Sequence, residues 1–182
     1  HLLLDQAFLW LDEYNVHGRR VGAAVSMCYR DYLRRAGGWR RTLHARLWRI
    51  QVGRIPLILL DSDVAQNAPN DRDLTARVYG GDLDTRIAQE IVLGIGGVRA
   101  LRLLNIDPKV WHMNEGHVAM LTLERVRERV MRGEDFRDAC ASVRRNTVFT
   151  THTPVPAGNE VFSVDLVNQH LEPWSRDTGV AA

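Results

Sequence analysis

Residues 110–117, Val-Trp-His-Met-Asn-Glu-Gly-His, and residues 147–153, Thr-Val-Phe-Thr-Thr-His-Thr, decide the fold of this chain. Each stretch begins with β-branched and aromatic residues that predict a short strand, and each ends in polar side chains. Between the two strands, apolar residues recur at helical spacing from Val118 to about Gly133 and again from Phe136 to Val143. A strand, two helices and a second strand are the elements of an α/β unit.

The upstream sequence extends this pattern. Two more strands are expected at Leu43–Arg49 and Ile55–Leu60, the second of them buried because its apolar run is continuous. Residues 67–73 have turn composition and predict a surface loop. A long helix is expected from Arg86 to Leu104, stopped by residues 105–108, Asn-Ile-Asp-Pro. The whole pattern predicts an α/β domain with a mostly parallel sheet.

Polar residues at the ends of the two strands are the functional candidates, because ligands of parallel sheets bind at the carboxyl ends of the strands. Asn114, Glu115 and His117 follow the first strand, and His152 and Thr153 follow the second. If the two strands are neighbours, their histidines and Glu115 converge on one crevice. The alternative is that Asn114 caps a helix, Glu115 complements the helix dipole and the histidines are core residues.

Composition excludes several classes of protein. The chain has 182 residues, of which 45% are hydrophobic and 25% charged, as in an average globular domain rather than a disordered chain. A net charge of +2 with dispersed arginines does not favour nucleic acid, and no apolar run approaches the roughly 20 residues of a membrane span. Cys28 and Cys140 lack metal-binding spacing and a signal peptide is not evident, so a reduced, cytoplasmic protein is expected.

Other motifs are weak. The glycines of residues 94–97 resemble a dinucleotide-binding turn, but no strand precedes them, and a helix made slim for close packing is the preferred interpretation. His112 and His117 are five residues apart across a strand-to-helix junction, so a zinc site is not expected. Glu115 and Glu160 would suit a glycosidase only if they lie at the correct separation in space. No serine lies in a nucleophile elbow.

Several motifs, in order along the chain, resemble the α-glucan phosphorylases, in particular the bacterial branch without a long regulatory N-terminus. The matching segments are Trp48–Leu57, Leu59–Asp63, Asp71–Asp82, Arg86–Glu90, Gly94–Leu101, Trp111–His117 and Phe149–Gly158. The resemblance covers about Leu43 to Gly179, whereas residues 1–42 do not match.

This resemblance implies part of a Rossmann-like N-terminal domain, residues 43–182, of a two-domain GT-B type glycosyltransferase. The implied reaction is reversible phosphorolysis of α-1,4-glucan by inorganic phosphate, giving glucose 1-phosphate with retained configuration. Pyridoxal 5′-phosphate would be bound by a C-terminal domain that lies beyond this chain, and family members generally form homodimers. Because Lys109 is the only lysine and does not match the cofactor lysine, no cofactor is expected in this chain.

The resemblance also implies roles for single residues. His152 matches the catalytic-site histidine, whose side chain bonds the glucosyl 6-hydroxyl and whose carbonyl faces the sugar. The residues implied to line the glucan channel are Asn114, Glu115, His117, Thr153, Glu160 and Arg86. Tyr79 and Asp82 correspond to the gate loop, which is shorter here than in the regulated enzymes.

Two other functions remain open at this point. A non-catalytic carbohydrate-binding module derived from the same domain would retain the sheet without turnover. A glycogen or starch synthase shares the two-domain architecture, but residues 150–154, Thr-Thr-His-Thr-Pro, have the phosphorylase form. On the leading interpretation, this chain alone is inactive.

Overall fold

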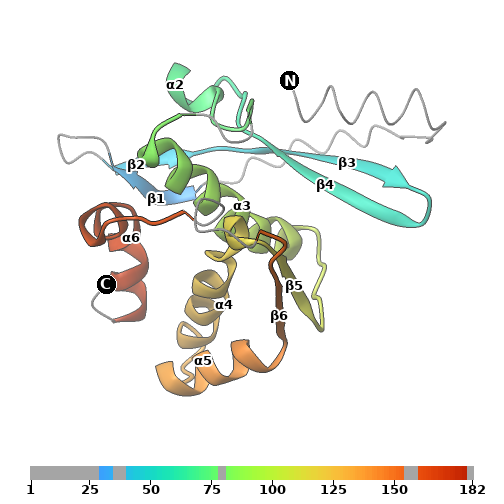
Figure 1. The fold of residues 1–182 in the computed structure, drawn as a ribbon, viewed down its shortest axis with the longest axis vertical. Helices are drawn as coiled ribbons and strands as arrows, with labels where there is room; N and C mark the ends of the chain where they lie inside the picture. Colours follow the sequence, from blue (N-terminus) through green and yellow to red (C-terminus); the bar gives the residue numbers. More distant parts are fainter. Residues whose placement is uncertain (1–28, 35–39, 78–80, 154–159, 180–182) are drawn as a thin grey trace.

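The computed structural model describes residues 29–34, 40–77, 81–153 and 160–179. It is a mixed α/β structure with three two-stranded sheets (Figure 1). The strands are β1 (Tyr29–Arg34), β2 (Arg40–Leu43), β3 (Arg46–Val52), β4 (Ile55–Asp61), β5 (Trp111–Asn114) and β6 (Thr147–Thr150). The helices are α2 (Pro69–Arg72), α3 (Leu83–Leu103), the 3-10 turn η1 (Gly116–Val118), α4 (Leu121–Val130), α5 (Phe136–Arg145) and α6 (Val164–Thr178).

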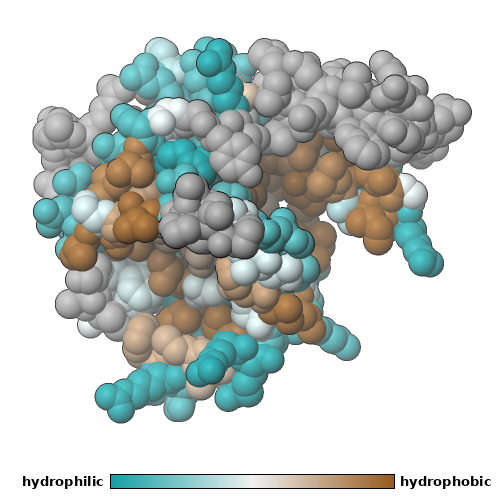
Figure 2. Space-filling model, viewed as in Figure 1, coloured by the Kyte–Doolittle hydropathy of each residue, from teal (hydrophilic) through white to brown (hydrophobic). Residues whose placement is uncertain are grey.

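The β3–β4 hairpin corrects one expectation, because β4 is not a buried strand. A two-residue turn with Gly53 at φ 57° joins the strands, and they pair antiparallel from Val52↔Ile55 onward. Ile55 is 64% exposed and Leu57 43%. The turn end of the hairpin projects away from the helices (Figure 1), and its apolar side chains show in brown in Figure 2. Of β4, Ile58 and Leu60 pack on the core; we call this end of the strand, away from the turn, the root of β4.

The segment 67–73 is also not a plain surface loop. It contains the short helix α2, and Asn67 and Asp71 are buried. The amide group of Asn67 donates to the carbonyl oxygens of His44 and Ser62, both at 2.7 Å, and its oxygen accepts from the His44 N–H at 2.8 Å. Turn residues with amide side chains can satisfy backbone groups in this way, so this turn is drawn into the interior.

Helix α3 is the centre of the core (Figure 1). Ile87, Ile91 and Ile95, spaced at four residues, are at most 1% exposed, which confirms the predicted helix. The prediction of a slim helix is confirmed at Gly94: a Cβ there would lie 2.6 Å from the Leu121 nitrogen. Among the described residues, no helix is both long enough and apolar enough to cross a membrane.

The predicted strand–helix–helix–strand unit is present, with β5 and β6 paired in parallel. Its first helix is divided into η1 and α4, and Asp135 caps α5 by accepting from the N–H groups of Arg137 and Asp138. The mostly parallel sheet is wrong for the described residues, because β1–β2 and β3–β4 are both antiparallel. A two-residue turn can only reverse the chain, whereas parallel strands need a crossover.

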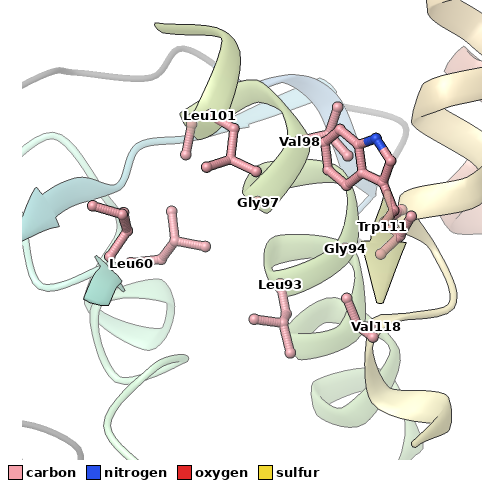
Figure 3. Close-up of a pocket in the computed structure, with 11 residues that line it drawn as sticks. Leu60, Leu93, Gly94, Gly97, Val98, Leu101, Trp111 and Val118 are labelled. Atoms are coloured by element: carbon pink, nitrogen blue, oxygen red, sulfur yellow. The ribbon is translucent and has the colours of Figure 1, made fainter. Parts of the chain in front are cut away.

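An apolar hollow of about 220 Å³ lies between the root of β4, α3 and β5. Figure 3 shows Leu60 of β4 on one side and Leu93, Gly97 and Leu101 of α3 next to it, with Trp111 on the side of α3 away from Leu60. Since its lining is almost wholly carbon, the hollow lacks the polar groups that a sugar or phosphate site requires.

Candidate functional site

The ends of β5 and β6 lie together, which meets the condition for a shared site. The register places Asn114 opposite Thr150, and the N–H of Glu115 donates to the Thr150 carbonyl at 2.8 Å. Parallel pairing therefore brings residues 114–115 beside residues 151–153. We call these five residues the strand-end cluster.

Glu115 is the centre of the strand-end cluster. It is 8% exposed, and its φ of 65° with ψ 177° is rare for a residue with a side chain. One carboxylate oxygen accepts from the His152 N–H at 2.5 Å and from the Thr153 hydroxyl at 3.4 Å. The other accepts from the Thr151 hydroxyl at 3.1 Å. The His152 N–H, as the largest cause, holds the pKa of the Glu115 carboxyl below its ordinary value, and the two hydroxyls add to this effect.

The His152 ring is oriented by a second contact. Its Nε2 lies 2.9 Å from Oδ1 of Asn114, on the neighbouring strand. One step back along the strands, His112 Nε2 lies 2.7 Å from the Thr150 hydroxyl. Both histidines are exposed, so the alternative of satisfied core histidines is wrong for them. Asn114 as a helix N-cap is wrong too, because it ends β5 and Glu115 precedes η1.

A second polar group lies on α3. The guanidinium of Arg86, 9% exposed, donates to Oε1 of Glu160 at 2.9 Å from Nε, with Nη2 2.8 Å from the same oxygen. Glu90 is one helical turn further along and 7% exposed. Burial raises its pKa to about 7, with Glu160 adding to the rise and Arg86 opposing it. We call Arg86, Glu90 and Glu160 the α3 cluster.

Of the residues that the sequence analysis selected, the structure therefore groups most into two clusters. Asn114, Glu115, His152 and Thr153 meet at the strand ends, whereas Arg86 and Glu160 meet on α3. His117 lies half-buried in η1, directly after the strand-end cluster. Glu115 and Glu160 therefore have different hydrogen-bond partners and belong to different clusters.

The gate-loop candidates are described only in part. Tyr79 lies outside the described residues. The side chain of Asp82 caps α3, accepting from the N–H and the hydroxyl of Thr85 at 2.9 Å. These donors, the N–H above all, lower the pKa of Asp82. In the structure Asp82 thus has the role of a helix cap.

Sequence reasoning missed Glu90 and Gln89. The Gln89 amide donates to the carbonyl oxygens of Leu74 and Arg77, both at 2.9 Å, and so ties the chain before residue 78 to α3. The signal was available, because positions 86, 89 and 90 are polar at i, i+3 and i+4 and therefore share one face of an otherwise apolar helix.

Metal chemistry has no support in the described part of the chain, where no three His, Cys, Asp or Glu side chains gather as ligands. The arrangement offers instead hydrogen-bonding groups: an exposed imidazole held by its neighbours, a nearby carboxamide, and the Arg86–Glu160 ion pair. Such groups bind and orient a polar, uncharged substrate.

Comparison with known proteins agrees with this chemistry. No family model matches the chain. Glycogen phosphorylase of Mycobacterium tuberculosis is 51% identical over 141 residues, covering 74% of this chain and 16% of the relative. Maltodextrin phosphorylase of Thermococcus litoralis is 48% identical over 131 residues, covering 72% of this chain and 16% of the relative.

A shorter match is to the 1,4-alpha-glucan branching enzyme of Rhodococcus jostii, 48% identical over 44 residues, or 24% of this chain and 6% of the relative. The chain thus spans about a sixth of the length of the phosphorylases that it matches. Identity near 50% over almost three quarters of the chain shows common descent. The chain is therefore homologous to one segment of the longer α-glucan phosphorylases.

Proposed function

We propose that these residues form part of the glucosyl and glucan site of an α-glucan phosphorylase, which transfers a glucosyl unit from α-1,4-glucan to inorganic phosphate and releases glucose 1-phosphate with retention. The observation that carries the proposal is the strand-end cluster, in which His152 is held through its N–H by Glu115 and through its ring by Asn114. The relatives named glycogen phosphorylase and maltodextrin phosphorylase support the same reaction.

The proposal includes a domain assignment. Residues 43–182 would form part of a Rossmann-like domain of a GT-B architecture. The support is the parallel pair β5–β6 with its helical crossover, and the location of the polar cluster at the carboxyl ends of both strands.

The geometry gives His152 two tasks. Because Asn114 Oδ1 is an acceptor, the Nε2 of His152 carries the proton, which leaves Nδ1 to accept from a sugar hydroxyl. The His152 carbonyl lies between two groups that Glu115 holds, the His152 N–H and the Thr153 hydroxyl. A main chain fixed in this way can present a carbonyl dipole toward the positive charge that develops at the anomeric carbon.

Asn114, Glu160 and Arg86 would line the approach of the glucan, together with His117 and Thr153. The Arg86–Glu160 pair supplies charged donors and acceptors to hydroxyls at fixed positions. None of these side chains needs to form a covalent bond, so the contribution of this segment is positioning and electrostatic stabilisation.

Pyridoxal 5′-phosphate, which the family uses, does not fit the residues of this chain. A Schiff base needs a lysine, and Lys109 is the only one. It is exposed in the turn between α3 and β5, at the opposite end of β5 from Asn114. We therefore assign no step of the reaction to the cofactor in this segment.

The test uses the full-length gene product that contains these residues, assayed with maltodextrin and inorganic phosphate. Glucose 1-phosphate is expected, and His152→Ala should lower kcat/KM at least about 100-fold, as for removal of one hydrogen-bonding group that stabilises a transition state. Arg137→Ala, on the exposed face of α5, is the matched control and should be without effect. Binding of maltodextrin without turnover would instead favour the non-catalytic module, and normal turnover by His152→Ala would refute the site.

A further inference from the structure

The geometry points to Glu115 as a positioning residue, which acts on the glucan through His152 and does not bind the glucan itself. This inference rests on the proposed function, and it changes the role that the family resemblance implied for Glu115. Three features of the strand-end cluster carry it: the use of the carboxylate oxygens, the backbone conformation, and the contact of the adjacent Asn114.

The carboxylate of Glu115 is already occupied. Its two oxygens receive three hydrogen bonds from three consecutive residues, Thr151, His152 and Thr153. The residue is 8% exposed, so little of the carboxylate is accessible to a sugar hydroxyl. Asn114 and His152, by contrast, are exposed. The side chains that can reach a glucan are those that flank Glu115.

The backbone of Glu115 shows that this side chain is required at this position. With φ 65° and ψ 177°, Glu115 adopts a conformation that favours glycine. An L-residue remains in such a conformation only when its surroundings hold it there. The bonds to residues 151–153 are the contacts that hold it.

Two adjacent residues thus fix both parts of His152. Glu115 holds its main chain through the N–H, and Asn114 holds its imidazole through Nε2. If Glu115 is lost, the turn at 151–153 loses its shared acceptor, and His152 no longer rests in a single orientation. A misplaced group costs transition-state stabilisation more than it costs substrate binding.

A double-mutant cycle in the full-length gene product tests this inference. The four proteins are the wild type, Glu115→Ala, His152→Ala and the double variant, each assayed for kcat and KM with maltodextrin and phosphate. Glu115→Ala should lower kcat about tenfold with KM nearly unchanged. If Glu115 orients the His152 side chain, the double variant should lose clearly less than the product of the two single losses, and any loss beyond that of His152→Ala reports the main chain, which alanine keeps. A double variant whose loss equals the product of the single losses would overturn the inference.

Glu115→Gln keeps the shape and one acceptor oxygen, so it should retain more kcat than Glu115→Ala and serves where the alanine variant folds poorly. Glu134→Ala is the matched control, because Glu134 also accepts two side-chain hydrogen bonds, from Arg129 and Ser142, but lies between α4 and α5. It should leave kcat and KM unchanged.

A spectroscopic readout separates this inference from the proposed function. In full-length protein labelled with 15N-histidine, the histidine amide signal that disappears in His152→Ala is assigned to His152. A carboxylate acceptor moves an amide proton downfield, so this signal should move upfield in Glu115→Ala and stay unchanged in Glu134→Ala. A wild-type protein without phosphorolysis would refute the proposed function alone. An amide-proton chemical shift of His152 that is the same in Glu115→Ala as in the wild type would refute the positioning role.

Discussion

Glu115 and Glu90 are both buried glutamates, 8% and 7% exposed, yet the pKa of Glu115 is lowered and that of Glu90 is raised. Glu115 faces three donors from residues 151–153, which lower its pKa. Glu90 has no hydrogen-bond donor among the described residues, and burial raises its pKa to about 7. Burial alone therefore does not decide whether a carboxyl group in this site is charged. The hydrogen-bond donors around the carboxyl group decide it.

The neighbours explain the difference. Glu115 lies where two parallel strands end, so the turn after β6 presents an N–H and two hydroxyls to it. Glu90 lies on a helix, where its nearest cation is Arg86, one turn earlier, and that guanidinium is bonded to Glu160. Glu160 therefore takes the cation and adds a like charge. The α3 cluster holds a proton that the strand-end cluster does not.

The largest expected effect on stability comes from replacing Glu90 by glutamine, which cannot carry a charge. The folded pKa of about 7 exceeds the ordinary value of 4.5, so the folded state keeps a proton that the unfolded state loses in this range. The stability tied to this proton is present below pH 4.5 and is lost as pH rises through 7. Glu90→Gln should therefore match the wild type near pH 4.5 and exceed it at pH 8 by about 3 kcal/mol in free energy of unfolding.

Urea unfolding at both pH values measures this difference. Glu172→Gln, on an exposed residue of α6, is the control and should give the same offset from the wild type at pH 4.5 and at pH 8. A Glu90→Gln variant with no more stability than the wild type at pH 8 would show that Glu90 is as well solvated as Glu172. The contrast with Glu115 would then fail.

The next effect concerns the close contact between α3, which carries Glu90, and α4. Gly94 lies one turn further along α3 on the same side, and a Cβ there would lie 2.6 Å from the Leu121 nitrogen and 2.8 Å from the Met120 Cβ. Backbone cannot yield to it cheaply, so Gly94→Ala should lower the free energy of unfolding by about 2 kcal/mol.

Gly97 provides the control for that packing effect. A Cβ on Gly97 meets no atom within 4 Å, so Gly97→Ala should gain up to about 1 kcal/mol from helix propensity. Equal effects of the two alanines in urea unfolding would contradict the close approach of α3 and α4.

The sequence predicted the parts of this site that depend on local pattern. The periodicity of Ile87, Ile91 and Ile95 predicts α3, and the polar ends of β5 and β6 predict a shared cluster once the strands are paired. The exposure of Ile55 is not predictable in this way, because a continuous apolar run looks the same on a buried strand and on a projecting hairpin. The raised pKa of Glu90 comes first from burial and is increased by Glu160, 70 residues away along the chain, and neither can be read from local pattern.

The smallest expected effect tests the backbone of Glu115. Glu115→Gly and Glu115→Ala both remove the carboxylate, so their difference reports the cost of φ 65° and ψ 177° for a residue with a Cβ, less the extra backbone entropy that glycine loses on folding. The glycine variant should melt higher than the alanine variant, by roughly 3 °C in Tm. Ala119 has φ −56° and ψ −32°, where alanine is preferred, so Ala119→Gly should lower Tm instead. A Tm of Glu115→Ala equal to or above that of Glu115→Gly would show that Glu115 is not held in an unfavourable conformation. The contrast between Glu115 and Glu90 would then rest on hydrogen bonds alone.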